Sequence, residues 1–160
     1  MQAKNRRKTK TKGVLKMLKG IPSVIPPELL KILMEMGHGD ELVISDGNFP
    51  AANYAQRLVR CDGHNVPELL DAILKFFPLD PYADAPVALM QVVPGDAVET
   101  PIWEVYKNII KKHEPVTNNV INIERFAFYE RAKQAYAIVA TGEKALYANI
   151  ILKKGVVIEK

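Results

Sequence analysis

One histidine of the 160-residue chain stands where acid/base chemistry could occur. His38 lies between two glycines in the run 36–41, where a predicted helix ends and a predicted strand begins. Glycines on both sides allow the backbone to approach a ligand closely, and an imidazole can take and give a proton near neutral pH. A histidine at a helix C-terminus can also stabilise the helix as a cation facing the negative end of its dipole. The local sequence leaves the catalytic and the capping roles equally open.

A carboxylate follows the apolar run 41–45, which predicts a short buried strand. This places Asp46 at the carboxyl end of a strand, where ligand-binding side chains tend to emerge in α/β sheets, and where a carboxylate can bind sugar hydroxyls. The turn residues Gly47 and Asn48 give Asp46 another explanation, an Asx turn. From these residues alone the turn is the favoured role.

A phenol and an amide lie two residues apart near the end of the chain. We predict a last strand over 146–152, and its period-2 alternation places Tyr147 and Asn149 on the same face. These groups offer donors and acceptors suited to a polyhydroxylated ligand. A half-exposed strand shows the same alternation, and by pattern alone that explanation is the commoner one.

Arg125 and Tyr129 are four residues apart and would lie along one side of a helix. An arginine beside aromatic residues can clamp a hydroxyl or a developing oxyanion. An ordinary ion pair with Glu124 or Glu130 is the simpler explanation of this arginine. The neighbouring Phe126 is expected to pack into the core.

Other site chemistries lack their usual motifs. The single cysteine and the three histidines are dispersed, so no metal site is predicted. The chain contains no Gly-x-Gly-x-x-Gly, no P-loop Gly-Lys-Ser/Thr and no Gly-x-Ser-x-Gly sequence, which removes the usual support for dinucleotide, nucleoside triphosphate and serine-hydrolase functions. Cys61 stands beside Asp62, whose charge raises the pKa of a thiol, so a packed cysteine is expected rather than a nucleophile.

The elements that must position these side chains alternate along the chain. Apolar periodicity and proline or glycine boundaries predict helices over 27–36, 67–77, 102–110 and 126–135, and strands over 41–45, 87–93, 120–123, 136–140 and 146–152. No linker divides them. We therefore predict a single-domain α/β fold, a sheet flanked by helices.

The charge of the chain is unevenly distributed. The net charge is +4, but residues 1–16 hold seven basic and no acidic residues, which leaves 15 basic against 18 acidic residues, or −3, in 17–160. We predict a disordered basic arm over 1–16 and a folded domain over 17–160. A solvated extension, or an upstream start before Met17, explains the arm better than nucleic-acid binding, which is not expected.

The chain has no run of 18 apolar residues, so no membrane span is predicted. A lone cysteine and the absence of a signal peptide favour the reducing cytoplasm.

Ordered motifs across the chain resemble the L-fucose mutarotase and D-ribose pyranase family. In the first half they are LKGI (18–21), PELL (27–30), EMGHGDE (35–41), SDGNFP (45–50) and RCDG (60–63). In the second half they are RFAFYERA (125–132), TGE (141–143) and YANIILKKGV (147–156). The resemblance covers 17–157, and the shared order is far more specific than any one motif.

This resemblance implies an enzyme that interconverts the anomers of a free sugar without a cofactor or a metal. It also implies an α/β fold that assembles into homo-oligomers, often decameric rings, and suggests a pocket completed by a neighbouring subunit. His38 matches the family's catalytic acid/base. The residues matched to sugar binding are Asp46, Arg125, Tyr147 and Asn149, with Tyr129 added from the same aromatic motif.

The substrate implied by the resemblance is L-fucose, with D-ribose as the alternative. The aromatic motif 125–132 is similar to the fucose branch, whereas Ala148 of the Tyr-x-Asn sequence is similar to the ribose branch, where fucose enzymes commonly have glycine. One methyl group in a pocket is worth only about 1–3 kcal/mol, so this difference does not decide the substrate. A non-enzymatic sugar-binding or transport accessory protein is the alternative from another class, and it would not need His38.

Overall fold

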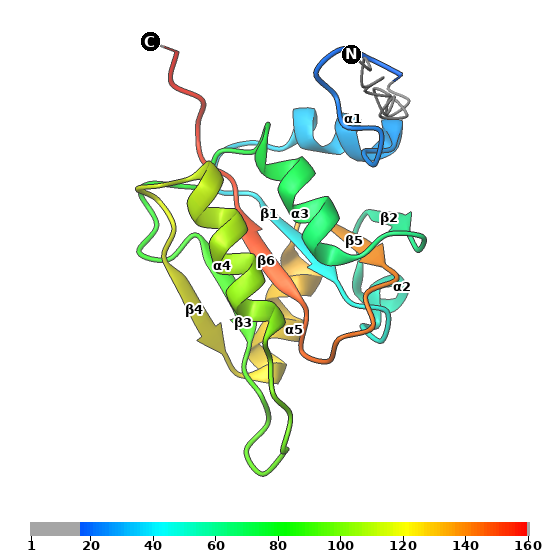
Figure 1. Ribbon diagram of the computed structural model, residues 1–160, viewed down its shortest axis with the longest axis vertical. Helices are drawn as coiled ribbons and strands as arrows, with labels where there is room; N and C mark the ends of the chain where they lie inside the picture. Colours follow the sequence, from blue (N-terminus) through cyan, green and yellow to red (C-terminus); the bar gives the residue numbers. More distant parts are fainter. Residues whose placement is uncertain (1–16, 160) are drawn as a thin grey trace, which may run out of the picture.

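The computed structural model describes residues 17–159, so the predicted arm over 1–16 lies outside the described residues. The chain forms one mixed sheet of six strands in the order β2-β5-β1-β6-β3-β4, with helices on both faces (Figure 1). The strands are β1 (Glu41–Ser45), β2 (Leu58–Cys61), β3 (Val87–Met90), β4 (Val120–Ile123), β5 (Ala137–Thr141) and β6 (Ile150–Lys153). The helices are α1 (Pro27–Glu35), α2 (Ala51–Tyr54), α3 (Val66–Leu74), α4 (Ile102–His113) and α5 (Arg125–Gln134).

Five of the six strands point in one direction. β1 and β2 both pair in parallel with β5, and β3 pairs in parallel with β4. β6 runs antiparallel to both β1 and β3, which therefore share one direction. We call the edge at which β1 to β5 end the carboxyl edge, and the opposite one the amino edge. The residues just before β6 thus lie at the carboxyl edge, beside the residues that follow β1.

Alternate side chains of the strands enter two separate cores. Leu42 and Ile44 of β1 pack in the larger core with residues of α1, α3 and α4, whereas Val43 between them packs in the smaller core with residues of α5. In Figure 1, α3 and α4 accordingly lie in front of the sheet and α5 behind it. A sheet covered on both faces explains why its strands consist of nearly continuous apolar residues.

Three helices begin at residues that deal with the unpaired backbone N–H groups of a helix start. Pro27 occupies the first turn of α1, where its missing N–H has no partner to lose. Asn65 caps α3 by accepting a hydrogen bond from the backbone N–H of Glu68 at 3.0 Å. Glu124 caps α5 in the same way, with its carboxylate accepting from the N–H groups of Phe126 and Ala127.

The structure confirms the predicted α/β class and most of the elements, with three corrections. The last strand begins at Ile150 rather than at 146, because Tyr147 has a φ of 52°, which breaks an extended strand. β3 ends at Met90 rather than at 93. The sequence analysis also missed α2 and β2, which are only four residues long each. No helix among residues 17–159 is long and apolar enough to cross a membrane.

Candidate active site

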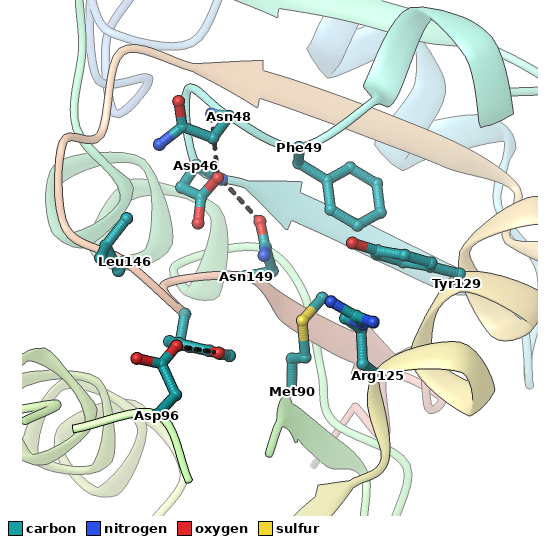
Figure 2. Close-up of a pocket in the computed structure, with 10 residues that line it drawn as sticks. Asp46, Asn48, Phe49, Met90, Asp96, Arg125, Tyr129, Leu146 and Asn149 are labelled. Atoms are coloured by element: carbon teal, nitrogen blue, oxygen red, sulfur yellow. Dashed lines mark hydrogen bonds between the residues drawn. The ribbon is translucent and has the colours of Figure 1, made fainter. Parts of the chain in front are cut away.

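A pocket of about 250 Å³ opens at the carboxyl edge of the sheet (Figure 2). It contains five of the six predicted site residues, which the strands and α5 bring together from distant parts of the chain: Asp46, Arg125, Tyr129, Tyr147 and Asn149. The rest of its lining is Asn48, Phe49, Met90, Asp96 and Leu146. The pocket combines polar groups with apolar walls on a scale smaller than the usual drug-sized site, which suits a small polyhydroxylated ligand.

Asp46 lies at the centre of the hydrogen bonds that build this pocket. One carboxylate oxygen accepts from the N–H of Asn48 at 3.0 Å, which is the Asx turn expected from the sequence. The other oxygen accepts from the N–H of Ala148 at 3.3 Å. Burial raises the pKa of Asp46, and the hydrogen bonds from these N–H groups oppose that rise. Asp46 is therefore both a turn residue and a pocket residue.

Asn149 holds the opposite strand end against Asp46. Its side-chain oxygen accepts a hydrogen bond from the backbone N–H of Asp46 at 2.8 Å, and only 4% of the residue is exposed. Because its oxygen faces Asp46, the amide N–H₂ of Asn149 remains as a donor on the pocket wall. The exposed-strand explanation of Tyr147 and Asn149 is wrong, since Asn149 is buried and both residues precede β6.

The unusual backbone of Tyr147 is held from α4. The indole Nε1–H of Trp103 donates to the carbonyl of Tyr147 at 2.8 Å, and the hydroxyl of the fully buried Tyr106 donates to the carbonyl of Ala148 at 2.8 Å. A non-glycine residue in the left-handed region is strained and persists only when its surroundings fix it. Trp103 therefore supports the segment that carries Tyr147.

Asp96, which the sequence analysis did not single out, binds the other end of Tyr147. The Tyr147 hydroxyl donates to a carboxylate oxygen of Asp96 at 2.6 Å, and this bond raises the pKa of Tyr147. Asp96 belongs to the segment 91–101 between β3 and α4, which projects at the bottom of Figure 1. The rule that selected Asp46 would also have selected Asp96, because it too follows a predicted apolar strand.

Arg125 and two aromatic rings form the other side of the pocket. The rings of Phe49 and Tyr129 meet edge to face with centroids 5.5 Å apart. In Figure 2 the Tyr129 hydroxyl points into the pocket, toward the side where Asn149 lies. Phe49 is only 9% exposed, so it is at once a core residue and a wall.

Arg125 has no carboxylate partner among the described residues, so the expected ion pair is not found. Glu124 caps α5 and Glu130 instead pairs with Lys133. The Nε of Arg125 is buried without a hydrogen-bond partner in the described part of the chain. The guanidinium carbon lies 4.7 Å from the ring centroid of Phe126, which is 62% exposed rather than in the core as expected. A cation kept free of carboxylates beside a pocket is available to oxygen atoms of a ligand.

His38 lies at the opposite, amino edge of the sheet and does not line this pocket. It precedes β1 whereas Asp46 follows it, and the five residues of that strand alone span roughly 15 Å. The imidazole Nε2 lies 3.0 Å from a carboxylate oxygen of Asp80, and the ring packs on Tyr82 with centroids 5.6 Å apart. His38 therefore pairs with Asp80, and the pocket lies one strand length away.

Asp80 is a further candidate that sequence analysis missed. Burial alone would raise its pKa, but hydrogen bonds from His38 and from the N–H of Tyr82 hold the pKa of Asp80 below its usual value. Its position depends on a long-range contact, since its N–H donates to the carbonyl of Lys153, the last residue of β6, at 3.0 Å. No local pattern places residue 80 beside residue 38.

A brace of hydrogen bonds joins three segments at the carboxyl edge. The Thr141 hydroxyl donates to the carbonyl of Ser45 at 2.7 Å, and the carbonyl of Glu143 accepts from Gly47 at 2.9 Å. The carboxylate of Glu143 accepts from the N–H groups of Val66, at the start of α3, and of Ala145. The TGE motif thus fixes the turn that carries Asp46. Within residues 17–159, no group of three or more His, Cys, Asp or Glu side chains is arranged to hold a metal ion.

Residues 19–157 match the RbsD / FucU transport protein family. The chain is 55% identical over 140 residues to the L-fucose mutarotase of Actinobacillus pleuropneumoniae serotype 5b (strain L20), covering 88% of this chain and 97% of that relative. It is 50% identical over 145 residues to the fucose mutarotase of Homo sapiens, covering 87% of this chain and 94% of that protein.

Solved structures of fucose mutarotase and of RbsD share the fold of this chain. The fucose mutarotase of Streptococcus pneumoniae, solved in complex with L-fucose, is similar with a TM-score of 0.84 and 56% identity, covering 88% of this chain and all of that one. Bacillus subtilis RbsD complexed with D-ribose has a TM-score of 0.68 at 20% identity over 84% of this chain and 95% of that one. The second likeness shows the shared fold alone.

Proposed function

Because this chain belongs to the RbsD / FucU transport protein family, we propose that it interconverts the α and β anomers of free L-fucose. The observation that carries the proposal is its identity of 50–56% with fucose mutarotases along nearly their whole length. The carboxyl-edge pocket, with its carboxylates, amide, phenols and guanidinium, offers the contacts that such a sugar needs. The lone buried Cys61 agrees with a reaction in the cytoplasm.

The reaction consists of two proton transfers and a rotation. A proton leaves the anomeric hydroxyl while the ring oxygen gains one, so the ring opens to the aldehyde. The aldehyde carbon rotates, and the reverse transfers close the ring on its other face. A positioned acid/base contributes about 10²–10⁴-fold to such a step, which suffices for a reaction that already proceeds in water.

The pocket side chains have roles that follow from their free hydrogen-bonding groups. Asp46 and the amide N–H₂ of Asn149 bind sugar hydroxyls. Arg125 stabilises the charge that develops on the sugar oxygen, since it has no carboxylate partner among the described residues. Tyr129 contributes its ring as a wall and its hydroxyl as a sugar contact. Tyr147 contacts a further sugar hydroxyl.

His38 is proposed as the acid/base, supplied by a second copy of the chain. Within one chain the sheet separates His38 from Asp46, so the proton shuttle of one protomer must face the pocket of its neighbour. Exposed apolar side chains at both places support a covered surface: Tyr82 beside His38 is 74% exposed, and Leu146 at the pocket is 51% exposed. Asp80 then orients the imidazole through its hydrogen bond with Nε2.

The assembly is proposed to be a closed homo-oligomer. A contact between two different surfaces of one chain, repeated head to tail, forms a ring when the rotation between successive copies closes. The amino edge of one protomer against the carboxyl edge of the next is such a contact. The family resemblance favours a decameric assembly of this kind.

Saturation-transfer NMR on equilibrated sugars tests the function directly, because it reads the exchange between anomers without trapping a product. Exchange of L-fucose should accelerate in the presence of the protein and return to the buffer rate with His38→Ala. D-Ribose at equal enzyme concentration is the comparison. Faster exchange of ribose would overturn the substrate, and no acceleration of any aldose would leave a sugar-binding or accessory protein.

A further inference from the structure

The least explained group in the pocket is the carboxylate of Asp96. It lies on the segment 91–101 and lines the cavity. One of its oxygens accepts a hydrogen bond from the Tyr147 hydroxyl at 2.6 Å. A short hydrogen bond to a carboxylate is about twice as strong as one between neutral groups. Asp96 is also exposed, so neither a buried charge nor the core requires a carboxylate there.

We propose that Asp96 is a positioning residue that commits the hydroxyl proton of Tyr147 and so makes this phenol an acceptor for one sugar hydroxyl. This inference deepens the proposed function and rests on it. A phenol has a single proton to donate. With that proton directed to Asp96, only the lone pairs of the Tyr147 oxygen face other groups.

One of those lone pairs is already used. The backbone N–H of Val93, on the same segment as Asp96, donates to the Tyr147 oxygen at 3.4 Å. The oxygen therefore retains room to accept from one hydroxyl in the pocket and has no proton for a ligand. Any ligand atom that meets Tyr147 well must itself be a donor.

The Tyr147 side chain is fixed at both ends, so its oxygen remains an acceptor toward the pocket. Trp103 holds the strained backbone of Tyr147, and Asp96 holds its hydroxyl. The raised pKa of Tyr147 has the same origin and keeps the phenol protonated at neutral pH. Tyr147 thus selects a hydroxyl by the direction of its hydrogen bond and takes no part as the general acid.

A double-mutant cycle separates this role from a structural one. The variants are Asp96→Ala, Tyr147→Phe and the double variant, with Glu99→Ala as the control because it removes a carboxylate from the same segment outside the pocket lining. L-Fucose is the probe, with KM and kcat from NMR exchange and Kd from calorimetry.

Asp96→Ala should raise KM and Kd by about 10-fold and leave kcat within about 2-fold. In the Tyr147→Phe background it should raise KM and Kd by less than about 2-fold further. Asp96→Asn should fall between Asp96→Ala and the parent protein.

Two results would overturn the inference: an unchanged Kd for Asp96→Ala, or an equal loss with and without the Tyr147 hydroxyl, which would mean that Asp96 acts only by folding its segment. Monodeoxyfluoro analogues of L-fucose, used as competitors, test the direction of the bond. Fluorine cannot donate a hydrogen bond, so the analogue fluorinated at the hydroxyl that meets Tyr147 should bind poorly to the parent protein. Its affinity should recover in Asp96→Ala, where the phenol is free to turn and donate. Equal discrimination by both proteins would contradict the proposal.

The two proposals fail in different ways. A protein that binds L-fucose but exchanges no anomers contradicts the mutarotase function, and the Kd cycle then still decides the role of Asp96. A protein that exchanges anomers while Asp96→Ala behaves as Glu99→Ala contradicts the role of Asp96 alone. A protein that does not bind L-fucose contradicts both.

Discussion

The imidazole of His38 meets the carboxylate of Asp80 at 3.0 Å, with the histidine side chain 45% exposed and the aspartate only 6% exposed. The aspartate also accepts from the backbone N–H of Tyr82 at 3.0 Å, so its position is fixed by the protein. This arrangement directs one side of the ring to a rigid acceptor and leaves the other side accessible. The proposed role of His38, as a proton shuttle for the pocket of a neighbouring copy, requires both of these features.

Asp80→Asn should lower kcat for L-fucose about 10-fold or more while KM stays within about 2-fold, because the imidazole loses its anionic partner but the pocket lies at the other edge. His38→Ala should cost about 10²–10⁴-fold in kcat. Saturation-transfer NMR over a range of fucose concentrations measures both constants.

Asp71 provides a matched control for that prediction. It forms a similar contact with His113 at 2.8 Å, between α3 and α4 and outside the pocket lining. Asp71→Asn should leave both constants unchanged. If Asp80→Asn and Asp71→Asn behave alike, Asp80 does not position the proton shuttle.

Asp46→Asn should weaken L-fucose binding by about 10-fold and make stability less sensitive to pH. The raised pKa of Asp46 means that the carboxyl ionises more readily in the unfolded chain than in the folded one. As pH rises from below the usual aspartate pKa through this raised pKa, the parent protein therefore loses stability relative to the variant. Urea denaturation at pH 3 and pH 7 measures the difference. If the free energy of unfolding of the parent protein rose relative to that of Asp46→Asn on going to pH 7, this account would be contradicted.

Gly142→Ala should destabilise the brace beneath Asp46 by about 1–3 kcal/mol, since a Cβ at this position would overlap the backbone carbonyl oxygen of Asp62. Gly63→Ala is the control, because its Cβ meets nothing within 4 Å, and it should change stability by less than about 0.5 kcal/mol. Thermal denaturation of both variants checks the difference. Equal melting temperatures would show that the close approach of the two loops is not required.

Dilution should reduce activity and stability together, because a pocket that takes His38 from a neighbour exists only in the assembly. Light scattering at each concentration, combined with the NMR exchange rate, tests the coupling. A monomer that retains full activity per chain would show that one chain suffices.

The sequence was informative wherever a signal was local. Proline at the first turn predicted α1 and α3, and the apolar run before Asp46 predicted both β1 and the place of Asp46 at its end. The short α2 and β2 carry too few residues for periodicity to show. The last strand begins later than expected because Tyr147 has a left-handed backbone, which depends on a hydrogen bond from α4 that no local pattern reveals.

Five of the predicted residues line one pocket, but the sequence did not predict how the candidate site is arranged. The family motifs brought out Arg125 and Asn149, although local patterns favoured an ion pair and an exposed strand for them. The separation of His38 from these residues follows from strand direction, since residues before and after β1 must lie at opposite edges. Asp80 was missed because the pairing that places it beside His38 involves Lys153, far along the chain.

The most direct test of the account mixes two defective chains. His38→Ala lacks the proton shuttle and Asp46→Asn lacks the pocket carboxylate, so each homo-oligomer should exchange L-fucose anomers slowly. The two variants are co-expressed with different affinity tags, and oligomers carrying both tags are measured by saturation-transfer NMR. If each site combines His38 of one protomer with the pocket of the next, roughly a quarter of the sites are intact and the mixed oligomer regains activity in that proportion. Mixed oligomers no more active than either variant alone would contradict a site shared between subunits.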